Sequence, residues 1–599
     1  MELVMAYLDE VFSPQDIKKM TFVELDKLAD EIRQAILLRN SLVGGHVASN
    51  LGIVETTLAL HYVFNAPEDK IIFDVSHQSY AHKMITGRKE GFLDAREYKH
   101  ISGFANPLES VYDAFYLGHT STSISLASGL AKARDLNGEN YNIIAVIGDG
   151  ALSGGEAFEG LNFTGAEIHG QLLIVVNDNE MSIAENHGGL YENLRLLRET
   201  QGQAENNFFK ALGFDYLYVE EGHNIEALVN AFMQIKDHNK PQIVHIHTLK
   251  GKGYTLAEQN KETWHKHQPF DIASGVTTIQ KSYKNYNELT IEYLNQKISQ
   301  GDNIAIITAG MPASFGFKPE IRQLWKERYI DVGIAEEHAI AMTSAMAKGG
   351  CRPIFCVGST FIQRAYDQLS QDLALNQNPA VILVYGGGIS SIDVTHLGVF
   401  DMAMMGNIPN LAYFSPAFYE EYISTLDWAL TQNQHSVVIR VPQDAPLHAN
   451  NYSLPAFATH QMIHQGQFVA IITDGHSYQR AEELSAKLKI RGVNPTLINA
   501  HYLSNVDKNL LQDLTLKHQI IITIEDGVLD GGFGEKVARF YGDKEMYVLC
   551  YGADKAFTNR VPLSELLQSY RLTPEQMIDD VMKLVSKIYG AHFHLLSEA

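Results

Sequence analysis

Cysteine is scarce in this sequence, whose 599 residues include three: Cys351, Cys356 and Cys550. Three thiols cannot form a disulfide framework, and their spacing matches no zinc-binding motif. Such low cysteine usage is typical of proteins in a reducing compartment, so we expect a cytoplasmic protein.

Long apolar runs are also missing. The sequence has no stretch of 18 apolar residues, which excludes an ordinary membrane-spanning helix. The apolar stretch at the N-terminus is interrupted by Asp9 and Glu10, whereas a signal peptide keeps its central segment uncharged. We therefore expect neither a membrane partner nor a cleaved leader.

Positive charge is in deficit. The sequence has 47 lysines and arginines against 70 aspartates and glutamates, a formal net charge of −23 at pH 7. This balance argues against nucleic acid or an anionic membrane as the main partner, because both repel an acidic surface. An acidic protein can still gather positive charge around a phosphorylated substrate, so basic residues within a predicted site are informative.

Two short apolar runs, each followed by a polar cluster, are the most informative feature that is present. Ile143–Ile147 is followed by Gly148–Gly150 (Gly-Asp-Gly), and Leu172–Val176 is followed by Asn177–Asn179 (Asn-Asp-Asn). Short β-branched runs that end in this way predict neighbouring buried parallel strands. Their polar ends then meet at the carboxyl edge of the sheet, where open α/β sheets bind ligands.

Asp149 and Asn179 are the candidate metal ligands at this edge. Mg²⁺ usually takes one or two protein oxygen ligands and completes its octahedron with phosphate oxygens and water. The small residues of 148–150 and 153–155 let backbone N–H groups approach a diphosphate. A dinucleotide site is disfavoured because its G-x-G-x-x-G pattern requires glycine where the chain has Ser153, and no G-x-x-x-x-G-K-[ST] loop is present. A cofactor with a metal-bound diphosphate is the interpretation that remains.

The rest of the chain repeats the α/β pattern, and it is too long for a single core. Thr21 and Glu24 form a capping box before a helix whose apolar positions recur at helical spacing. Strand-like runs then alternate with helical stretches in three series, which predicts an α/β protein of three domains with mostly parallel sheets. We place the domains at 1–288, which ends in a polar linker, at 289–455 and at 456–599.

Several longer motifs carry a family resemblance. They are Gly44–Gly52, Asp74–Gln78, Gly118–Ser123, the clusters around Asp149 and Asn179, Asp331–His338, Ser359–Gln368 and the Thr395–His396 pair. In collinear order over nearly the whole chain they resemble 1-deoxy-D-xylulose-5-phosphate synthase, and the block at 359–368 is the most specific of them. The resemblance implies a transketolase-like homodimer that uses thiamine diphosphate and Mg²⁺. It also implies that pyruvate and glyceraldehyde 3-phosphate are joined to 1-deoxy-D-xylulose 5-phosphate with loss of CO₂.

The resemblance also assigns a role to Glu336. This residue follows the run Ile330–Ala335 and matches the family glutamate that protonates the pyrimidine nitrogen of the cofactor. That role needs a carboxyl that keeps its proton, and burial would raise its pKa accordingly. The neighbouring Glu337 suits a solvated position at a helix start better. Phe361 matches the aromatic residue that stacks on the pyrimidine ring.

Histidines in the family motifs are candidates for proton transfer, because imidazole titrates near neutral pH. Among 25 histidines the candidates are His46, His77, His119, His265, His338 and His396, of which His46, His77, His265 and His396 join Glu336 in the predicted catalytic set. The resemblance further implies cofactor contacts by His77, Gly118, His119, Gly150, Ala151, Asn179, Lys250, Glu336 and Phe361, metal binding by Asp149, Asn179 and Met181, and substrate contacts by His46, Ser49, Arg364, His396 and Arg440. His245 and His247 alternate along a strand like a metal pair, but no third ligand is near them, so a structural role is favoured.

The chain departs from the family pattern at the site of the aldehyde acceptor. It has Gly358 and Gly386 where the family has a tyrosine and an arginine that contact the aldehyde's phosphate. Arg364 and Arg440 remain, and two guanidinium groups can still bind a phosphate in a bidentate way. The segment from Asn179 to Asn206 is shorter than in the family, which would remove part of the cover over the site.

Three functions stay open at this point. The first is a 1-deoxy-D-xylulose-5-phosphate synthase that feeds isoprenoid, thiamine or pyridoxal phosphate synthesis. The second is a synthase-like transketolase or carboligase that uses a different aldehyde, which Gly358 and Gly386 favour. The third is a non-catalytic cofactor-binding or regulatory protein, which is disfavoured because Glu336, Asp149 and Asn179 are all present.

Overall fold

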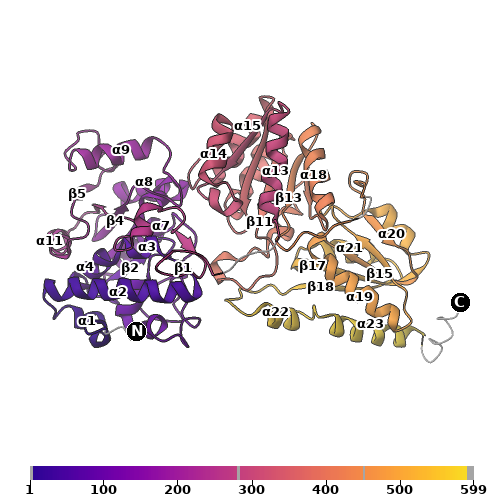
Figure 1. The fold of residues 1–599 in the computed structure, drawn as a ribbon, viewed down its shortest axis with the longest axis horizontal. Helices are drawn as coiled ribbons and strands as arrows, with labels where there is room; N and C mark the ends of the chain where they lie inside the picture. The colour runs from indigo at the N-terminus through magenta and orange to yellow at the C-terminus, as the bar shows by residue number, and fades with distance from the viewer. Residues whose placement is uncertain (1–4, 279–282, 450–451, 590–599) are drawn as a thin grey trace. The chain divides into compact units, whose positions relative to one another are not determined.

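The computed structural model describes residues 5–278, 283–449 and 452–589 (Figure 1). By its internal contacts the chain divides into two compact units. Unit 1 comprises Met1–Ser282, Gly310–Ala313 and Asp331–Ala335, and unit 2 comprises Tyr283–Ala309, Ser314–Ile330 and Glu336–Ala599. Residues 279–282 of the predicted polar linker lie outside the described residues.

Unit 1 is built on a five-stranded sheet in the order β2-β3-β4-β6-β5, and all of its strands are parallel. The strands are β2 (Lys70–Phe73), β3 (Ile143–Gly148), β4 (Leu172–Asp178), β5 (Asp215–Val219) and β6 (Gln242–His247). The predicted pairing of the two apolar runs is confirmed, because β3 and β4 are neighbours in a register that aligns Gly148 with Asn177. β4 is longer than predicted and includes Asn177 and Asp178, so only Asn179 of that cluster follows the strand.

Helices cover both faces of this sheet because its strands are apolar on both sides. In β3, Ile144 and Val146 belong to one buried cluster, whereas Ile143, Ala145 and Ile147 belong to another. This alternation follows from the two-residue period of a strand. The helices of unit 1 are α1 (Pro14–Ile17), α2 (Phe22–Val43), α3 (Ala48–Leu51), α4 (Val54–Val63), α5 (Tyr80–Lys83), α6 (Glu90–Leu93), α7 (Ser123–Asn137), α8 (Gly155–Glu167), α9 (Gly189–Glu199), α10 (Phe208–Ala211), α11 (Ile225–Ile235) and α12 (Thr255–Gln259).

The long helix α2 begins at the predicted capping box. The backbone N–H of Thr21 donates to a carboxylate oxygen of Glu24 at 2.8 Å, and the N–H of Glu24 donates back to Oγ1 of Thr21 at 3.4 Å. Both partners therefore satisfy donors that a helix N-terminus otherwise leaves unpaired.

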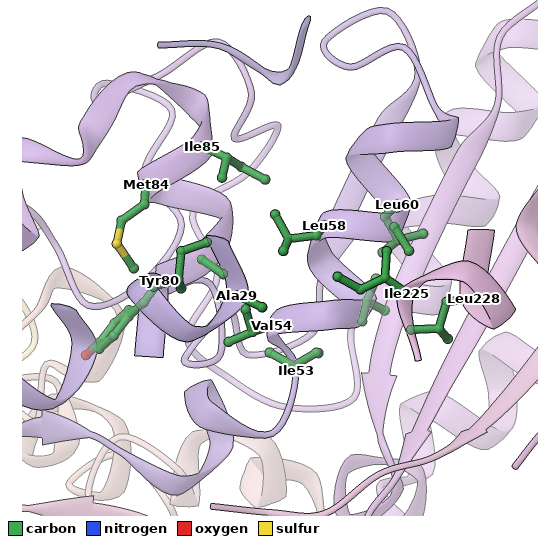
Figure 2. Packing of buried hydrophobic residues seen from close by; sticks show 14 of the residues in the cluster. Ala29, Ile53, Val54, Leu58, Leu60, Tyr80, Met84, Ile85, Ile225 and Leu228 are labelled. Carbon is green, nitrogen blue, oxygen red and sulfur yellow. The ribbon is translucent and has the colours of Figure 1, made fainter. Parts of the chain in front are cut away.

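Helix α4 is the centre of the first buried cluster (Figure 2). Figure 2 shows Val54 of α4 beside Ala29 of α2, and Leu60 of α4 beside Ile225 and Leu228 of α11. Each such side chain contributes roughly 1.5–3 kcal/mol when it is fully removed from water. Because α3 ends two residues before α4 begins, this packing also anchors the segment that carries the first family motif.

A second, two-stranded sheet in unit 1 joins distant segments. Strand β1 (Gly45–His46) pairs antiparallel with β7 (Lys266–His267), so that His46 lies opposite Lys266. The sequence predicts only a polar linker in the region of β7. The strand could not be recognised locally because two residues are too few to show an alternating pattern.

Unit 2 contains two sheets, and both are mostly parallel. A six-stranded sheet has the order β12-β13-β11-β10-β8-β9, and a five-stranded sheet has the order β14-β16-β15-β17-β18, in which β14 is antiparallel to β16. The α/β class with mostly parallel sheets is thus confirmed. The predicted second domain contains the first of these sheets and the predicted third domain contains the other, while the exact boundaries stay a prediction.

The elements of unit 2 have the following bounds. Its strands are β8 (Ile304–Thr308), β9 (Tyr329–Asp331), β10 (Arg352–Gly358), β11 (Val381–Tyr385), β12 (Leu411–Phe414), β13 (Ser436–Arg440), β14 (Gln461–His464), β15 (Phe468–Thr473), β16 (Thr496–Asn499), β17 (His518–Val528) and β18 (Tyr547–Ala553). Its helices are α13 (Tyr286–Ser299), α14 (Pro319–Trp325), α15 (Glu336–Lys348), α16 (Tyr366–Gln368), α17 (Asp401–Met405), α18 (Tyr419–Thr431), α19 (Tyr478–Ile490), α20 (Lys508–Leu514), α21 (Phe533–Tyr541), α22 (Leu563–Ser569) and α23 (Pro574–Tyr589).

Candidate active site

Asp149 begins the 3₁₀ turn η3 (Asp149–Ser153) directly after β3, at the carboxyl edge of the sheet. Its side chain is buried, and Oδ2 accepts a hydrogen bond of 2.7 Å from Nδ2 of Asn186. Burial and the nearby charge of Asp178 raise the pKa of Asp149 well above its usual range. The ionised form of this carboxyl therefore lacks sufficient compensating positive charge, and a divalent cation would supply it.

Asn179 directly follows β4, the strand that pairs with β3. Its side chain is buried, and its Oδ1 has no hydrogen-bond partner among the described residues. Buried polar atoms are normally paired, so an unpaired amide oxygen at this edge fits a position for a cation. Asp178 is already engaged, because it pairs with Arg198 and receives a hydrogen bond of 2.9 Å from Nε2 of His245. Within the described ranges no group of three or more His, Cys, Asp or Glu side chains is placed to hold a metal, so a cation here would need amide, backbone and non-protein oxygens in addition to the carboxylate of Asp149.

The loop after Asn179 packs closely over η3. A Cβ added at Gly150 would lie 2.8 Å from Cα of Ser182, so glycine is required for this approach. Lys250 is buried, and its Nζ donates to the backbone oxygen of Ser182. Burial lowers the pKa of Lys250 to about 8, and the charge of Asp149 opposes that shift. An ammonium group thus lies in the electrostatic range of the candidate metal ligand.

The segment from Asn179 to Asn206, which is shorter than in the resembled family, contacts the turn η3. Tyr191 of α9 donates its hydroxyl to the backbone oxygen of Asp149 at 3.2 Å. In the same region Met181 forms an isolated antiparallel bridge with Glu185. Ala151 accepts a hydrogen bond of 2.7 Å from Oγ of Ser121 through its backbone oxygen.

The family motif Gly118–Ser123 is anchored by a buried carboxylate. Asp74 accepts hydrogen bonds from the backbone N–H groups of Ser121 at 2.8 Å and Ser123 at 2.9 Å. Gly118 and His119 precede the backbone segment that Asp74 holds. Gly118 is buried and His119 is half-buried.

Three predicted histidines form a cluster in unit 1. The ring centroids of His46 and His77 are 5.1 Å apart, those of His46 and His265 are 5.6 Å apart, and those of His77 and His265 are 5.1 Å apart. Phe104 closes one side, with its ring 5.6 Å from that of His46. Burial and the charge of Lys250 hold the pKa of His265 well below its usual range, so this imidazole is neutral at physiological pH.

Asn50 holds the backbone of this histidine cluster in place. Its Nδ2 donates to the backbone oxygens of His46 at 2.9 Å and His77 at 2.7 Å, and its Oδ1 accepts from the N–H of Tyr80 at 3.0 Å. Ser49, its neighbour in α3, has a buried Oγ with no hydrogen-bond partner among the described residues. Asn50 thus links the two segments that carry His46 and His77, and Ser49 precedes it in the same helix.

Glu336 is the first residue of α15 in unit 2 and is buried. Its Oε2 lies 3.8 Å from a terminal guanidinium nitrogen of Arg364. Burial raises the pKa of Glu336 to about 7, although the charge of Arg364 acts in the opposite direction. The adjacent Glu337 is half-buried and His338 is exposed, so Glu336 is the residue of this motif that is placed to keep a proton near neutral pH.

Phe361 and His396 meet in unit 2. Their ring centroids are 5.7 Å apart with an edge-on geometry. Nδ1 of His396 lies 2.9 Å from Oγ1 of Thr395, which donates in turn to Oδ1 of Asp393 at 2.9 Å. This local chain of contacts orients the imidazole. Arg364 lies one turn beyond Phe361, in the 3₁₀ helix η6 (Ile362–Ala365).

Arg440 is fully buried at the end of β13 and is already engaged. Its Nε and one terminal nitrogen donate to the two carboxylate oxygens of Asp401 at 2.9 and 3.0 Å, a bidentate pair. The same terminal nitrogen also donates to the backbone oxygen of Asp526 at 2.8 Å. A phosphate at this position would therefore meet a guanidinium that has protein partners on several sides.

Comparisons with known proteins agree over nearly the whole chain. The family model described as 1-deoxy-D-xylulose-5-phosphate synthase matches residues 8–206 and 197–248, the transketolase pyrimidine-binding domain matches 282–446, and the transketolase C-terminal domain matches 459–577. The 1-deoxy-D-xylulose-5-phosphate synthase of Caldanaerobacter subterraneus subsp. tengcongensis is 36% identical, over 98% of this chain and 100% of that protein. The protein of the same name from Clostridium beijerinckii is 38% identical, over 97% and 100%. The chain belongs to the 1-deoxy-D-xylulose-5-phosphate synthase family.

Solved structures were also compared with this synthase-family chain. Transketolase from Campylobacter jejuni is 16% identical, covering 94% of this chain and 100% of that one, with a TM-score of 0.44. Transketolase from Pichia stipitis, described as mutants of residue H66, is 16% identical over 95% and 98%, with a TM-score of 0.44.

The predicted site residues of this synthase-family chain fall into groups within each unit. In unit 1 a first group, around the ends of β3 and β4, contains Asp149, Gly150, Ala151, Asn179, Met181 and Lys250. A second group contains His46, Ser49, His77 and His265, and Gly118 and His119 lie on the turn held by Asp74. In unit 2 Glu336 lies with Arg364, Phe361 lies with His396, and Arg440 lies with Asp401. His245 has both ring nitrogens engaged, by Tyr216 at 2.8 Å and Asp178 at 2.9 Å, which agrees with the structural role that its sequence favours.

Asn50, Asn186 and Tyr191 were missed by sequence reasoning. Each acts through contacts with the backbone or with another polar side chain, and such contacts leave no pattern in the sequence. Asn50 had one usable signal, because it lies inside the first family motif, directly after the predicted substrate contact Ser49. Asn186 and Tyr191 lie in the shortened segment, where the family pattern offered no guide.

The raised pKa of Glu336 predicts a pH-dependent stability for the synthase-family protein. The pKa of Glu336 is 4.5 in the unfolded chain and about 7 in the folded protein, so the folded state binds the proton more tightly. The free energy of unfolding is therefore unaffected below pH 4.5 and decreases as the pH rises to 7. Glu336→Gln removes this loss, so we expect the variant to gain about 3 kcal/mol relative to the parent between these limits. Thermal unfolding of the cofactor-free proteins at pH 5 to 8 measures the difference, with Glu337→Gln as the control. Parallel pH profiles of parent and Glu336→Gln would contradict the assignment.

Proposed function

We propose that this protein joins pyruvate to glyceraldehyde 3-phosphate, with thiamine diphosphate as cofactor, to give 1-deoxy-D-xylulose 5-phosphate and CO₂. The observation that carries the proposal is the likeness to curated 1-deoxy-D-xylulose-5-phosphate synthases at 36–38% identity over at least 97% of the chain. It extends over all three predicted domains, including the two that carry the predicted site residues, so the activity is that of a transferase of the transketolase type. The product leads to isoprenoid synthesis, and we propose thiamine synthesis as a second use.

The residues present fit the proposed cofactor and a magnesium ion. The unpaired Oδ1 of Asn179 and the buried, charge-deficient carboxyl of Asp149 support a cation at the sheet edge. We assign the metal to Asp149, Asn179 and Met181, the diphosphate end to His77, Gly118, His119, Gly150, Ala151 and Lys250, and the pyrimidine ring to Glu336 and Phe361. When bound, thiamine diphosphate supplies a thiazolium carbon that adds to the keto group of pyruvate and accepts the electrons released with CO₂.

The chain's own residues would manage protons and orient the substrates. Glu336 holds a proton on its carboxyl at neutral pH and can share it with a ring nitrogen, because burial favours its neutral form. The neutral imidazole of His265 can accept or donate one proton, and His46 and His77 lie close enough to contact the same substrate. His396 has an oriented ring that suits a similar role toward the acceptor aldehyde.

We assign the substrate contacts to His46, Ser49, Arg364, His396 and Arg440. The unpaired hydroxyl of Ser49 and the guanidinium group of Arg364 are donors that support this assignment, whereas the assignment of Arg440 rests on the family resemblance. A homodimer in the cytoplasm is also proposed, on the family resemblance and the low cysteine content. Among the described residues, the helices include none with the length and apolar character to cross a membrane.

Incubation with thiamine diphosphate, Mg²⁺, pyruvate and glyceraldehyde 3-phosphate tests the function. We expect 1-deoxy-D-xylulose 5-phosphate and CO₂ in equal amounts, identified by NMR and by carbonate trapping. The Glu336→Ala variant is the matched control and should form neither product at a comparable rate. Consumption of pyruvate without a 1-deoxy sugar phosphate would reject the proposed acceptor, and no consumption would reject the reaction.

A further inference from the structure

The space beside Gly388 is occupied by a carboxylate. A Cβ added at Gly388, whose φ is +110°, would lie 1.9 Å from Oδ2 of Asp526, so no other residue fits there without displacing that carboxylate. Oδ1 of Asp526 accepts a hydrogen bond of 3.0 Å from the N–H of Ile389, next to the glycine. The acidic side chain of Asp526, from β17, therefore lies against the end of the glycine run 386–388, whereas a Cβ added at Gly386, where the family has an arginine, would meet no described atom within 4 Å.

The same carboxylate faces Arg440. One terminal guanidinium nitrogen lies 3.7 Å from Oδ2 of Asp526 and 3.7 Å from Oδ2 of Asp474. The remaining nitrogens are engaged by the bidentate pair with Asp401. Three carboxyl groups thus surround one guanidinium, so this position carries no spare positive charge for an incoming anion.

Asp526 is the member of this group that reaches solvent. Its side chain is 18% exposed, whereas those of Asp401, Asp474 and Arg440 are 0% exposed. Asp526 is therefore the carboxylate of this group that an anion from solvent can meet.

Asp526 is ionised at neutral pH. Burial raises the pKa of Asp526, but the hydrogen bond from His476 and the charge of Arg440 outweigh burial and hold it at about 2. Its negative charge would repel a phosphate group at a distance of a few ångströms through a partly buried medium, where such repulsion is poorly screened.

We propose that Asp526 is a specificity-determining residue that weakens recognition of the acceptor's phosphate group by Arg440. The inference rests on the proposed function, because it assumes that the acceptor site includes Arg440. The enzyme then distinguishes phosphorylated from unphosphorylated aldehydes less sharply than an enzyme whose arginine is open to the phosphate. Neutralising Asp526 would release one guanidinium nitrogen for a charge-assisted hydrogen bond to phosphate.

The test compares Asp526→Asn with the parent holoenzyme. Asparagine keeps an oxygen that can accept from Ile389 and removes the charge. We expect the dissociation constant for inorganic phosphate, measured by calorimetry, to fall about tenfold, the effect of one charge-assisted contact. The ratio of kcat/KM for glyceraldehyde 3-phosphate to that for unphosphorylated D-glyceraldehyde should rise by about the same factor. Asp530→Asn is the matched control, since it removes the same charge from an exposed residue four positions away.

The outcomes separate this inference from the proposed function. Unchanged phosphate affinity and an unchanged aldehyde ratio in Asp526→Asn would overturn the inference, as would an equal change in Asp530→Asn. Asp526→Ser repeats both measurements if the asparagine variant does not fold. If neither parent nor variant forms a 1-deoxy sugar phosphate, the proposed function fails, while tighter phosphate binding by the variant would still support the role of Asp526.

Discussion

Glu336→Gln is expected to slow hydrogen exchange at the thiazolium C2 of bound thiamine diphosphate by about 100-fold to 10,000-fold, the usual contribution of a positioned acid or base. Glutamine has nearly the same shape but cannot give up a proton. The buried site favours a protonated carboxyl at neutral pH, with Arg364 3.8 Å away as the opposing influence. Cofactor binding should change little, because the magnesium and diphosphate contacts are assigned to other residues.

Rapid-quench deuterium exchange followed by proton NMR measures this rate on the bound cofactor. Glu337→Gln is the matched control, because it changes the adjacent, half-buried carboxyl in the same helix turn. Exchange at a near-normal rate in Glu336→Gln would mean that another group delivers the proton. A large decrease in Glu337→Gln would show that charge in this turn matters more than the position of Glu336.

Asp149→Ala is expected to weaken binding of thiamine diphosphate with Mg²⁺ by more than about 100-fold, because the cation would lose its carboxylate ligand and the diphosphate its bridging charge. The fold should be retained. The carboxylate is buried beside Asp178 and is unfavourable there without a cation, so its removal relieves a repulsive contact. The substitution removes the hydrogen bonds from Asn186 and from the backbone N–H of Gly150, and the attraction to Lys250.

Calorimetric titration of thiamine diphosphate in the presence of Mg²⁺ measures this effect, and circular dichroism reports on the fold. Glu159→Ala removes an exposed carboxylate from α8, the helix that follows η3, and should bind the cofactor as the parent does. Tight binding by a folded Asp149→Ala protein would reject the metal assignment. An unfolded variant would be replaced by Asp149→Asn, which keeps an oxygen but lowers its charge.

The parallel sheet of unit 1 could be predicted because its signals are local. Ile143–Ile147 and Leu172–Val176 are each apolar on both sides, and each is followed by residues that suit a sheet edge. The end of β4 was misplaced by two residues because Asn177 and Asp178 are polar and yet buried. Their side chains are engaged by Thr248 and Arg198, partners that sequence pattern alone does not identify.

The histidine group could be predicted only through family resemblance. His46, His77 and His265 come from segments up to about 220 residues apart, and nothing in their local sequence indicates that they meet. The surroundings of Arg440 could be predicted neither from local sequence pattern nor from the family resemblance. One of its three carboxyl neighbours comes from α17, one from the turn that follows β15, and one from β17. The resemblance predicts only a phosphate contact for that arginine.

The pairing of β1 with β7 limits where this sequence can accept insertions and deletions. Two residue pairs, Gly45 with His267 and His46 with Lys266, fix the register that places His265 beside His46, together with backbone hydrogen bonds from Val47 to His265 and from Ala48 to Trp264. A slip by one residue would turn the side chains of one strand to the opposite face. Insertions and deletions within β1 or β7 are therefore constrained by the histidine cluster, whereas the stretch between β6 and β7 is largely loop, and loops usually tolerate such changes.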